Sequence, residues 1–200
     1  MDINFWNTRY KEPEFAYGIE PNDFLKSKIQ IFKPNSKILC LAEGEGRNAI
    51  FLAEFKHDVT AVDYSIEGLN KLSILANERD LKIETICADL KDYKIELNKW
   101  DAIVCIFGHF PANLRKSIFT QVHGGLKSKG VFLMEAYDKN QLKFKTGGPQ
   151  IEELLYSAEE LEFDFHEFNN ISIQTHIKEI SEGVYHNGIS SVIQVVAVKD

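Results

Sequence analysis

Short, continuous hydrophobic runs alternate with helix-like stretches through the first two thirds of the chain. The runs predict strands at residues 37–41, 58–62, 82–87, 100–107 and 131–136. The stretches predict helices at residues 47–55, 65–76 and 113–126, the second capped by Ser65 and the third ended by residues 127–130. Strands that are apolar along their whole length are buried on both faces, so we predict a parallel sheet covered by helices on both sides.

The last quarter of the chain has a different pattern. Residues 151–161 predict a helix, and residues 164–178 and 189–198 predict two longer strands with no helix between them. The turn-rich residues 182–188 join these strands, which predicts an antiparallel hairpin. The expected fold is therefore α/β, a Rossmann-like doubly wound sheet of seven strands, mostly parallel, with a C-terminal antiparallel hairpin.

Composition narrows the class of protein. Two hundred residues with 44% hydrophobic content fit one domain, 1–200, with an N-terminal segment 1–30 and a core 36–200. The net charge of −7 argues against nucleic acid or anionic membranes as general partners. No apolar run approaches the ~20 residues of a membrane helix, and the N-terminus lacks the order of a signal peptide. Three cysteines without paired spacing predict reduced core residues, with no metal site. We expect a cytoplasmic protein.

The most informative segment follows the first predicted strand. Residues 37–41 lead into Gly44 and Gly46, and a helical pattern begins directly afterwards. Glycine is needed where the backbone takes positive φ or approaches a ligand closely. A strand that turns through such a loop into a helix presents N–H groups to an anionic or nucleotide-like ligand. Asp63 ends the second strand, at the spacing where a carboxylate accepts hydrogen bonds from a ribose diol.

Two classes of protein share this arrangement: nicotinamide dinucleotide binders and S-adenosylmethionine (SAM) methyltransferases. The run Gly44-x-Gly46-x-x-Ala49 fits the dinucleotide fingerprint in its alanine variant. A C-terminal antiparallel hairpin is unusual for dinucleotide dehydrogenases, and the sequence has no Tyr-x-x-x-Lys pair. An NAD(P)-dependent oxidoreductase is therefore the alternative enzyme, and a SAM-binding protein without turnover is the alternative outside catalysis.

Four features together resemble class I SAM-dependent methyltransferases of the small bacterial type, near the tellurite-resistance and thiopurine methyltransferase-like group. They are Leu41-Ala-Glu-Gly-Glu-Gly-Arg-Asn48, Val62-Asp-Tyr-Ser65, Cys87-Ala-Asp-Leu90 and the C-terminal hairpin. Residues 15–24 also resemble the lead-in segment of that group. The resemblance covers essentially the whole chain.

The resemblance implies roles for individual residues, each near one part of SAM. Gly44 and Gly46 are expected to pass under the methionine and ribose, with Glu43 and Asn48 beside them. Asp63 is expected to bind the ribose, and Phe107 to lie near the methionine portion. The adenine is expected to contact Tyr64, Ala88, Asp89 and Leu90, although Asp89 could instead cap a turn.

One departure from the family pattern concerns the first motif. Cys40 and Ala42 stand where the family usually has an acidic residue and another glycine. The resemblance then leaves Glu43 to supply a carboxylate for the ammonium of the methionine portion.

Residues outside the motifs suggest where the acceptor lies. His109 follows the fourth strand, where a histidine that titrates near neutrality could act as a general base, orient the acceptor, or only pack on the next helix. Arg115 could pair with an anionic acceptor or be a solvated surface residue. Trp6 and Tyr17 belong to an aromatic N-terminal segment that is either a cover for the sheet edge or a lid.

Two loops complete the picture. Residues 147–149 are either a plain loop or a flap on the acceptor side. Tyr185 and His186 fall in the hairpin connection, where we expect a solvent-exposed turn. The predicted reaction is methyl transfer from SAM to a small-molecule acceptor by in-line displacement, leaving S-adenosylhomocysteine (SAH), without a metal. The predicted assembly is a monomer or weak homodimer.

Overall fold

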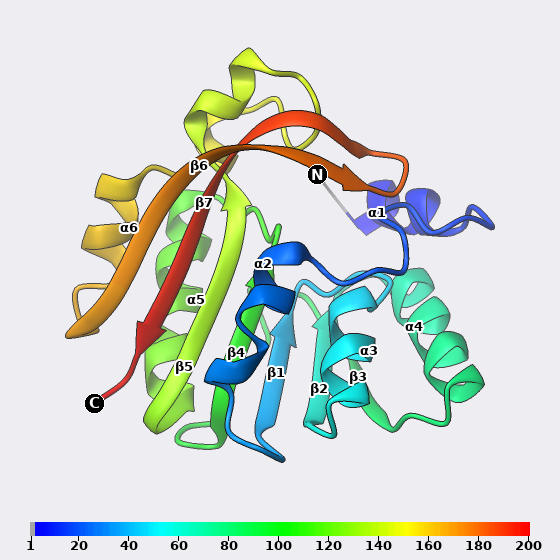
Figure 1. Ribbon diagram of the computed structural model, residues 1–200, viewed down its shortest axis with the longest axis horizontal. Helices are drawn as coiled ribbons and strands as arrows, with labels where there is room; N and C mark the ends of the chain where they lie inside the picture. The colour runs from blue at the N-terminus through cyan, green and yellow to red at the C-terminus, as the bar shows by residue number, and fades with distance from the viewer. Residues whose placement is uncertain (1–2) are drawn as a thin grey trace.

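The computed structural model describes residues 3–200, which contain one seven-stranded sheet (Figure 1). The strands lie in the order β3-β2-β1-β4-β5-β7-β6. The first five strands in this order, β3, β2, β1, β4 and β5, are parallel to one another, and β7 runs antiparallel to both of its neighbours. The strand bounds are β1 Lys37–Leu41, β2 Asp58–Asp63, β3 Ile83–Cys87, β4 Trp100–Ile106, β5 Leu126–Tyr137, β6 Asn170–Glu182 and β7 His186–Val198. The predicted fold class is confirmed.

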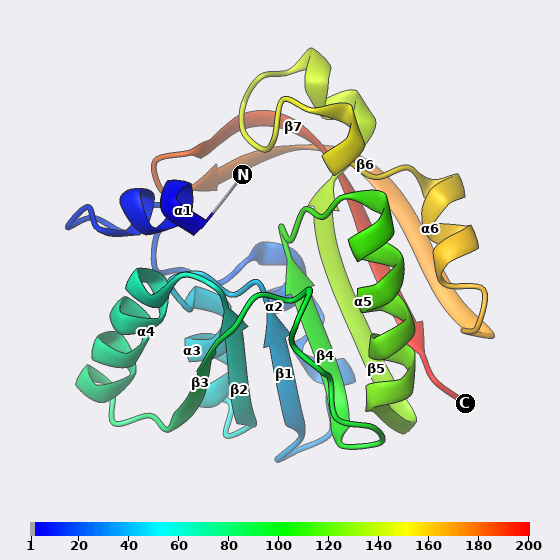
Figure 2. The ribbon, with the colours of Figure 1, turned by 180° about the vertical axis from the view of Figure 1, so that it is seen from behind.

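Helices cover both faces of the sheet, as the two opposite views in Figures 1 and 2 show. Side chains of α2 (Asp23–Ser27), α3 (Arg47–Glu54) and α4 (Ile66–Glu78) pack on one face, and those of α5 (Ala112–Gly125) and α6 (Ala158–Asp164) on the other. Strand β1 serves both cores, because Ile38 and Cys40 face the first group whereas Leu39 and Leu41 face the second. This two-sided burial explains why the central strands are apolar throughout.

Local signals place one helix boundary correctly and misplace another. The hydroxyl of Ser65 accepts the N–H of Gly68 at 3.3 Å, so the predicted cap of α4 is confirmed. Strand β5 begins directly after α5, at Leu126, so residues 127–130 are not the helix end we expected. The reason is that Leu126 already pairs with Trp100, before a register shift in the same ladder.

The predicted helix at residues 151–161 is wrong in its extent. The structure has a 3₁₀ turn at Glu152–Leu154 and then α6, which starts only at Ala158. Tyr156 is fully buried between them, and its backbone exchanges hydrogen bonds with Tyr137 and Lys139 at the end of β5. Ser157 and Glu160 then form a capping box that starts the new helix.

The C-terminal hairpin is confirmed, but its strands are displaced from the predicted ranges. Strand β6 starts at Asn170 because α6 and the buried Phe165 and Phe168 occupy the residues before it. Strand β7 starts at His186, so only residues 183–185 remain in the turn. Cys40 and Cys105 are buried as expected, whereas Cys87 is exposed because β3 is an edge strand.

The N-terminal segment crosses above the carboxyl ends of the parallel strands. Helix α1 (Ile3–Tyr10) packs beside α4, and the chain then runs past the tip of the hairpin to α2 and a 3₁₀ turn at Ile29–Ile31 (Figure 1). The N–H of Val184 in the hairpin turn donates to the carbonyl of Ala16 at 2.8 Å. Of the segment 1–30, Met1 and Asp2 lie outside the described residues. Residues 3–200 hold no helix that could span a membrane.

Candidate functional site

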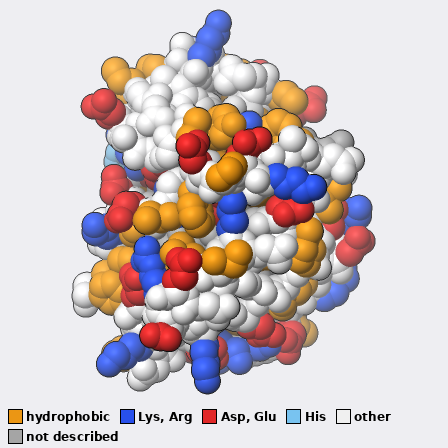
Figure 3. Space-filling view, turned by 90° about the vertical axis from the view of Figure 1, so that its right-hand side faces the viewer, with side chains coloured by type: hydrophobic (Ala, Val, Ile, Leu, Met, Phe, Trp, Pro, Cys, Tyr) orange, Lys and Arg blue, Asp and Glu red, His pale blue; other side chains and the backbone are white. Residues whose placement is uncertain are grey.

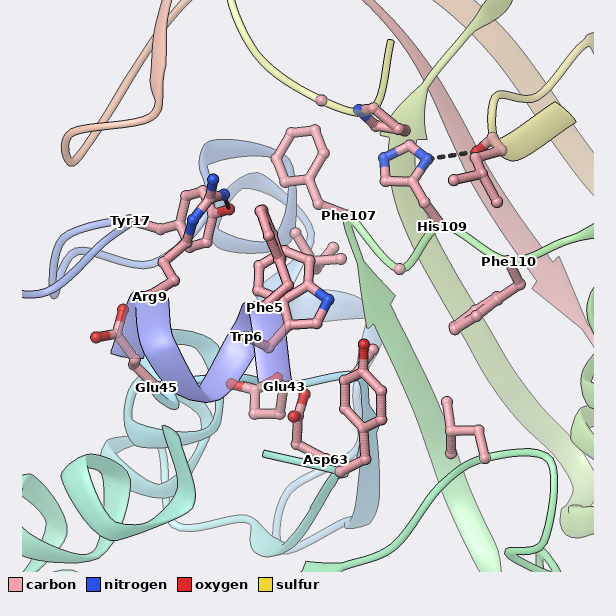
Figure 4. Close-up of a pocket in the computed structure, with 18 of the residues that line it drawn as sticks. Phe5, Trp6, Arg9, Tyr17, Glu43, Glu45, Asp63, Phe107, His109 and Phe110 are labelled. Carbon is pink, nitrogen blue, oxygen red and sulfur yellow. Dashed lines mark hydrogen bonds between the residues drawn. The ribbon is translucent and has the colours of Figure 1, made fainter. Parts of the chain in front are cut away.

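A cavity of about 660 Å³ lies at the carboxyl ends of β1 to β4, beneath α1 and the hairpin turn. Parallel α/β sheets bind ligands at this edge, and the volume falls within the usual range of small-molecule sites. All the predicted site residues except Gly44 and Arg115 line it: Trp6, Tyr17, Glu43, Gly46, Asn48, Asp63, Tyr64, Ala88, Asp89, Leu90, Phe107 and His109. Figure 4 shows how several of these side chains surround the cavity.

The glycine loop has the positive φ angles that its sequence predicts. Gly44 and Gly46 have φ of +60° and +88°, and Ala42, in the place of the usual glycine, takes +53°. A Cβ on Gly46 would lie 2.1 Å from Cδ1 of Leu72, so the packing of α4 requires this glycine. A Cβ on Gly44 would lie 2.6 Å from the hydroxyl of Tyr10. The chain's own side chains, not open ligand space, therefore lie against both glycines.

Asp63 connects the glycine loop to the second strand. One carboxylate oxygen accepts the N–H of Gly44 at 2.9 Å and the other accepts the N–H of Ser65 at 2.8 Å. Burial raises the pKa of Asp63, while these backbone donors oppose the change. The side chain lines the cavity and forms no ion pair within residues 3–200. A carboxylate has about four lone-pair sites, so these backbone donors leave Asp63 able to accept a ligand hydroxyl.

Glu43 lies next to Asp63 on the cavity wall (Figure 4). Its Oε1 accepts the N–H of Ala49 at 2.7 Å, at the start of α3. Burial raises the pKa of Glu43 to about 7, because removing the charged carboxylate from water is unfavourable. Cys40 is fully buried in the core and does not line the cavity. Glu43 therefore lines the cavity at the first motif, and Cys40, which stands in the place of the usual acid, does not.

The end of β3 contributes a shallower wall. Ala88, Asp89 and Leu90 line the cavity together with Tyr64 from the end of β2. Asp89 also caps the following turn, since its Oδ1 accepts the N–H of Lys91 at 2.9 Å. Partial burial raises the pKa of Asp89, but the hydrogen bonds and charge of Lys91 outweigh that effect and hold it below its ordinary value. The turn cap expected as the alternative is therefore present, and the contact of Asp89 with adenine stays a prediction.

The end of β4 is strained at the cavity. Phe107 takes φ of +54°, a conformation that a bulky side chain rarely adopts, and its ring packs 4.7 Å from that of His186. His109 donates its Nδ1–H to the carbonyl of Leu154 at 2.8 Å, so the neutral ring carries its lone pair on Nε2. Nε2 has no partner within residues 3–200. Burial lowers the pKa of His109 to about 4, so it does not titrate near neutrality as we expected.

Aromatic residues of α1 and the hairpin cover the cavity. Phe5 and Trp6 project from α1 toward its interior, with Arg9 beside Tyr17 (Figure 4). The guanidinium of Arg9 donates to the hydroxyl of Tyr17 at 2.7 Å. The ring of Tyr17 lies 4.3 Å from that of His186, which is only 6% exposed. The expected exposed turn is therefore wrong for His186, because the N-terminal segment packs on it.

The remaining predicted residues separate into two groups. Residues 147–149 line the cavity, whereas Arg115 does not. The side chain of Arg115 is buried on α5, where its Nε donates to Asp164 at 2.8 Å, so it is neither a cavity residue nor a solvated one. Asn48 lines the cavity and also accepts the N–H of Asn22 at 2.9 Å, which fixes the start of α2. Neither Arg9 nor His186 has a local sequence signal that assigns it to the site.

The strand order, the antiparallel β7 and the cavity beside the glycine loop together define the fold of class I SAM-dependent methyltransferases. Residues 38–130 match the family described as methyltransferase domain. The predicted resemblance is thereby confirmed at the level of the class, and the tellurite-resistance and thiopurine subgroup stays a prediction. Among curated proteins, none matches the chain.

Solved structures share this fold at low sequence identity. One, from a study of the conversion of a disulfide bond into a thioacetal group during echinomycin biosynthesis, has a TM-score of 0.78 at 15% identity, covering 100% of this chain and 90% of that one. TehB from Haemophilus influenzae has a TM-score of 0.71 at 17% identity, covering 98% of this chain and 66% of that one. Magnesium protoporphyrin IX methyltransferase from Synechocystis PCC 6803 was solved with bound SAM. It has a TM-score of 0.63 at 15% identity, covering 89% of this chain and 76% of that one.

Proposed function

We propose that this protein binds SAM and transfers its methyl group to a small-molecule acceptor by in-line displacement. The observation that carries the proposal is the position of Asp63. Its carboxylate fixes the glycine loop through the N–H of Gly44, and the side chain lines the cavity at the carboxyl end of β2. That is where a carboxylate can accept both hydroxyls of a ribose. The methyltransferase domain match supports the same reaction class.

The residues present fit the parts of SAM. Three cavity carboxylates lie along successive strand ends, with Asp89 after β3, Asp63 ending β2 and Glu43 after β1. We assign the adenine to Asp89, the ribose to Asp63 and the ammonium of the methionine portion to Glu43. Tyr64, Ala88 and Leu90 flank the adenine in this assignment, and Asn48 and Phe107 flank the methionine portion.

SAM supplies a methyl group already activated by its sulfonium. The chain's task is therefore alignment and exclusion of water, and holding two reactants in line is worth roughly 7–11 kcal/mol of barrier. Phe5 and Trp6 are placed to exclude water from above. His109 lines the cavity, and its Nε2 is buried without a partner among residues 3–200, so this nitrogen can accept a hydrogen bond from an acceptor that carries a proton and packs against the ring. Its low pKa makes His109 better suited to orient the acceptor than to retain the proton.

A small-molecule acceptor is supported by the shape and charge of the site. The cavity is covered by α1 and the hairpin, and aromatic and aliphatic side chains provide most of its wall. Acidic and basic side chains are interspersed on the face shown in Figure 3, which gives no broad basic surface there for nucleic acid. The structural neighbours act in different chemical contexts, so their fold does not transfer an acceptor to this chain.

Product formation tests the proposal directly. The purified protein would be incubated with SAM and a panel of thiols, phenols, amines and metalloid anions, and SAH would be measured by mass spectrometry. We expect acceptor-dependent SAH that disappears in Asp63→Ala and falls in His109→Ala. Tight SAM binding with no product across the panel would favour a binding protein without turnover. Hydride transfer from NADH with no SAM binding would favour the oxidoreductase alternative.

A further inference from the structure

Charged residues around the cavity differ in whether the chain itself neutralises them. Three of them form close ion pairs: Glu45 with Lys71 at 2.7 Å, Arg47 with Glu182 at 2.7 Å and Asp89 with Lys91 at 3.1 Å. Within residues 3–200, the cavity residues Asp63, Glu43 and Arg9 form none. Among the described residues, the cavity therefore presents two carboxyl groups and one guanidinium that form no ion pair.

Arg9 is held in an aromatic setting. Its guanidinium lies 4.0 Å from the ring centre of Tyr185, 4.5 Å from that of Phe5 and 5.4 Å from that of Trp6. The side chain is half-buried, and one N–H donates to the hydroxyl of Tyr17. Aromatic faces stabilise the positive charge but accept hydrogen bonds poorly, so the other donors are suited to an anionic ligand. A planar guanidinium fits a carboxylate through two parallel hydrogen bonds.

The position of Arg9 along the sheet indicates which carboxylate it would take. Its partner Tyr17 packs on His186, which in turn packs on Phe107 at the end of β4. Arg9 and Tyr17 lie on one side of the view in Figure 4, and His109 lies on the other. Arg9 is thus linked through Tyr17 and His186 to Phe107, near which the methionine portion is expected, and it lies across the cavity from His109.

The carboxylate of Glu43 and the guanidinium of Arg9 have opposite charges, which match the two charged groups of an α-amino acid. Glu43 comes from the glycine loop below the cavity and Arg9 from α1 above it. An α-amino acid carries an ammonium and a carboxylate on one carbon. We propose that Arg9 binds the carboxylate of the methionine portion of SAM, so that ligand binding holds α1 over the site. This inference rests on the proposed function.

A comparison of two ligands isolates the carboxylate. SAH contains the amino acid part, whereas 5′-methylthioadenosine keeps the adenine, ribose and thioether without it. By isothermal calorimetry, Arg9→Met should bind SAH about 10- to 100-fold more weakly than the native protein, as expected for a charged hydrogen-bonded pair. Its affinity for 5′-methylthioadenosine should change less than about twofold.

Lys11→Met is the matched control, because Lys11 follows α1 directly and pairs only loosely with Glu67, at 3.6 Å. It removes the same charge and should leave both affinities unchanged. Decarboxylated SAH provides a second route that does not rely on one variant. It should bind the native protein about as weakly as SAH binds Arg9→Met, with little further loss in that variant.

The outcomes separate this inference from the proposed function. Equal SAH affinity in the native protein and Arg9→Met would overturn the inference, and Arg9 would then be assigned to binding of the acceptor. Equal losses for SAH and 5′-methylthioadenosine would overturn it in favour of a purely structural role in α1. Failure of the native protein to bind either ligand would overturn the proposed function itself, and the inference with it.

Discussion

Glu43 should make the affinity for SAH depend on pH near neutrality. Burial raises the pKa of this carboxyl from an ordinary value of 4.5 to about 7, so the unliganded protein is a mixture of charged and neutral forms at pH 7. The ionised form is the one that can attract an ammonium group. Binding should therefore improve as the pH rises through 7 and should release a proton at lower pH.

The size of the effect follows from that pKa. The ionised fraction of Glu43 rises from about a tenth at pH 6 to about nine tenths at pH 8, so SAH affinity should rise roughly tenfold over this range. Calorimetry in two buffers of different ionisation enthalpy should detect release of nearly one proton at pH 6 and almost none at pH 8.

Glu43→Gln is the control for this prediction, because glutamine can still accept the N–H of Ala49 but cannot ionise. Titration of the ligand's own amine persists in this variant, so the difference between the two proteins reports Glu43. 5′-Methylthioadenosine, which has no ammonium, should show little dependence on Glu43. The same pH slope in the native protein and in Glu43→Gln would refute the reasoning.

Three further substitutions probe the site and the fold. Asp63→Ala should weaken SAM binding by about 100-fold or more in calorimetry, since a charged acceptor is lost and two buried N–H groups lose their partner; native affinity would contradict its assigned role. His109→Ala should lower turnover with SAM affinity within about twofold, and native turnover should show no inflection from His109 between about pH 5.5 and 8. Gly46→Ala should lower the free energy of unfolding by about 1–3 kcal/mol in urea, because its Cβ would overlap Leu72; an unchanged midpoint would count against the packing argument.

Much of the fold follows from local patterns in the sequence. The central strands are buried on both faces, which selects apolar residues at consecutive positions and makes them recognisable. The cap at Ser65 and the glycines before α3 are also local signals. The break at Tyr156 is different, because its apolar neighbours suit a helix as well as a buried bridge. The Ser157–Glu160 capping box was the available signal for where α6 begins.

The candidate site was only partly predictable. Glu43, Asp63 and Asp89 follow strands, and the edge where parallel strands end is shared, so their meeting could be expected. Arg9 and Tyr185 meet across 176 positions of sequence, through a contact that depends on how α1 packs against the hairpin turn. The pKa of His109 likewise depends on burial by residues distant in the chain, including Leu154. Such features require tertiary structure.

Calorimetric titration of the purified protein with SAM, SAH and NADH tests the central claim most directly. The account predicts micromolar binding of both adenosyl ligands and no binding of NADH. Binding of NADH alone would contradict it and move the search to a hydride acceptor.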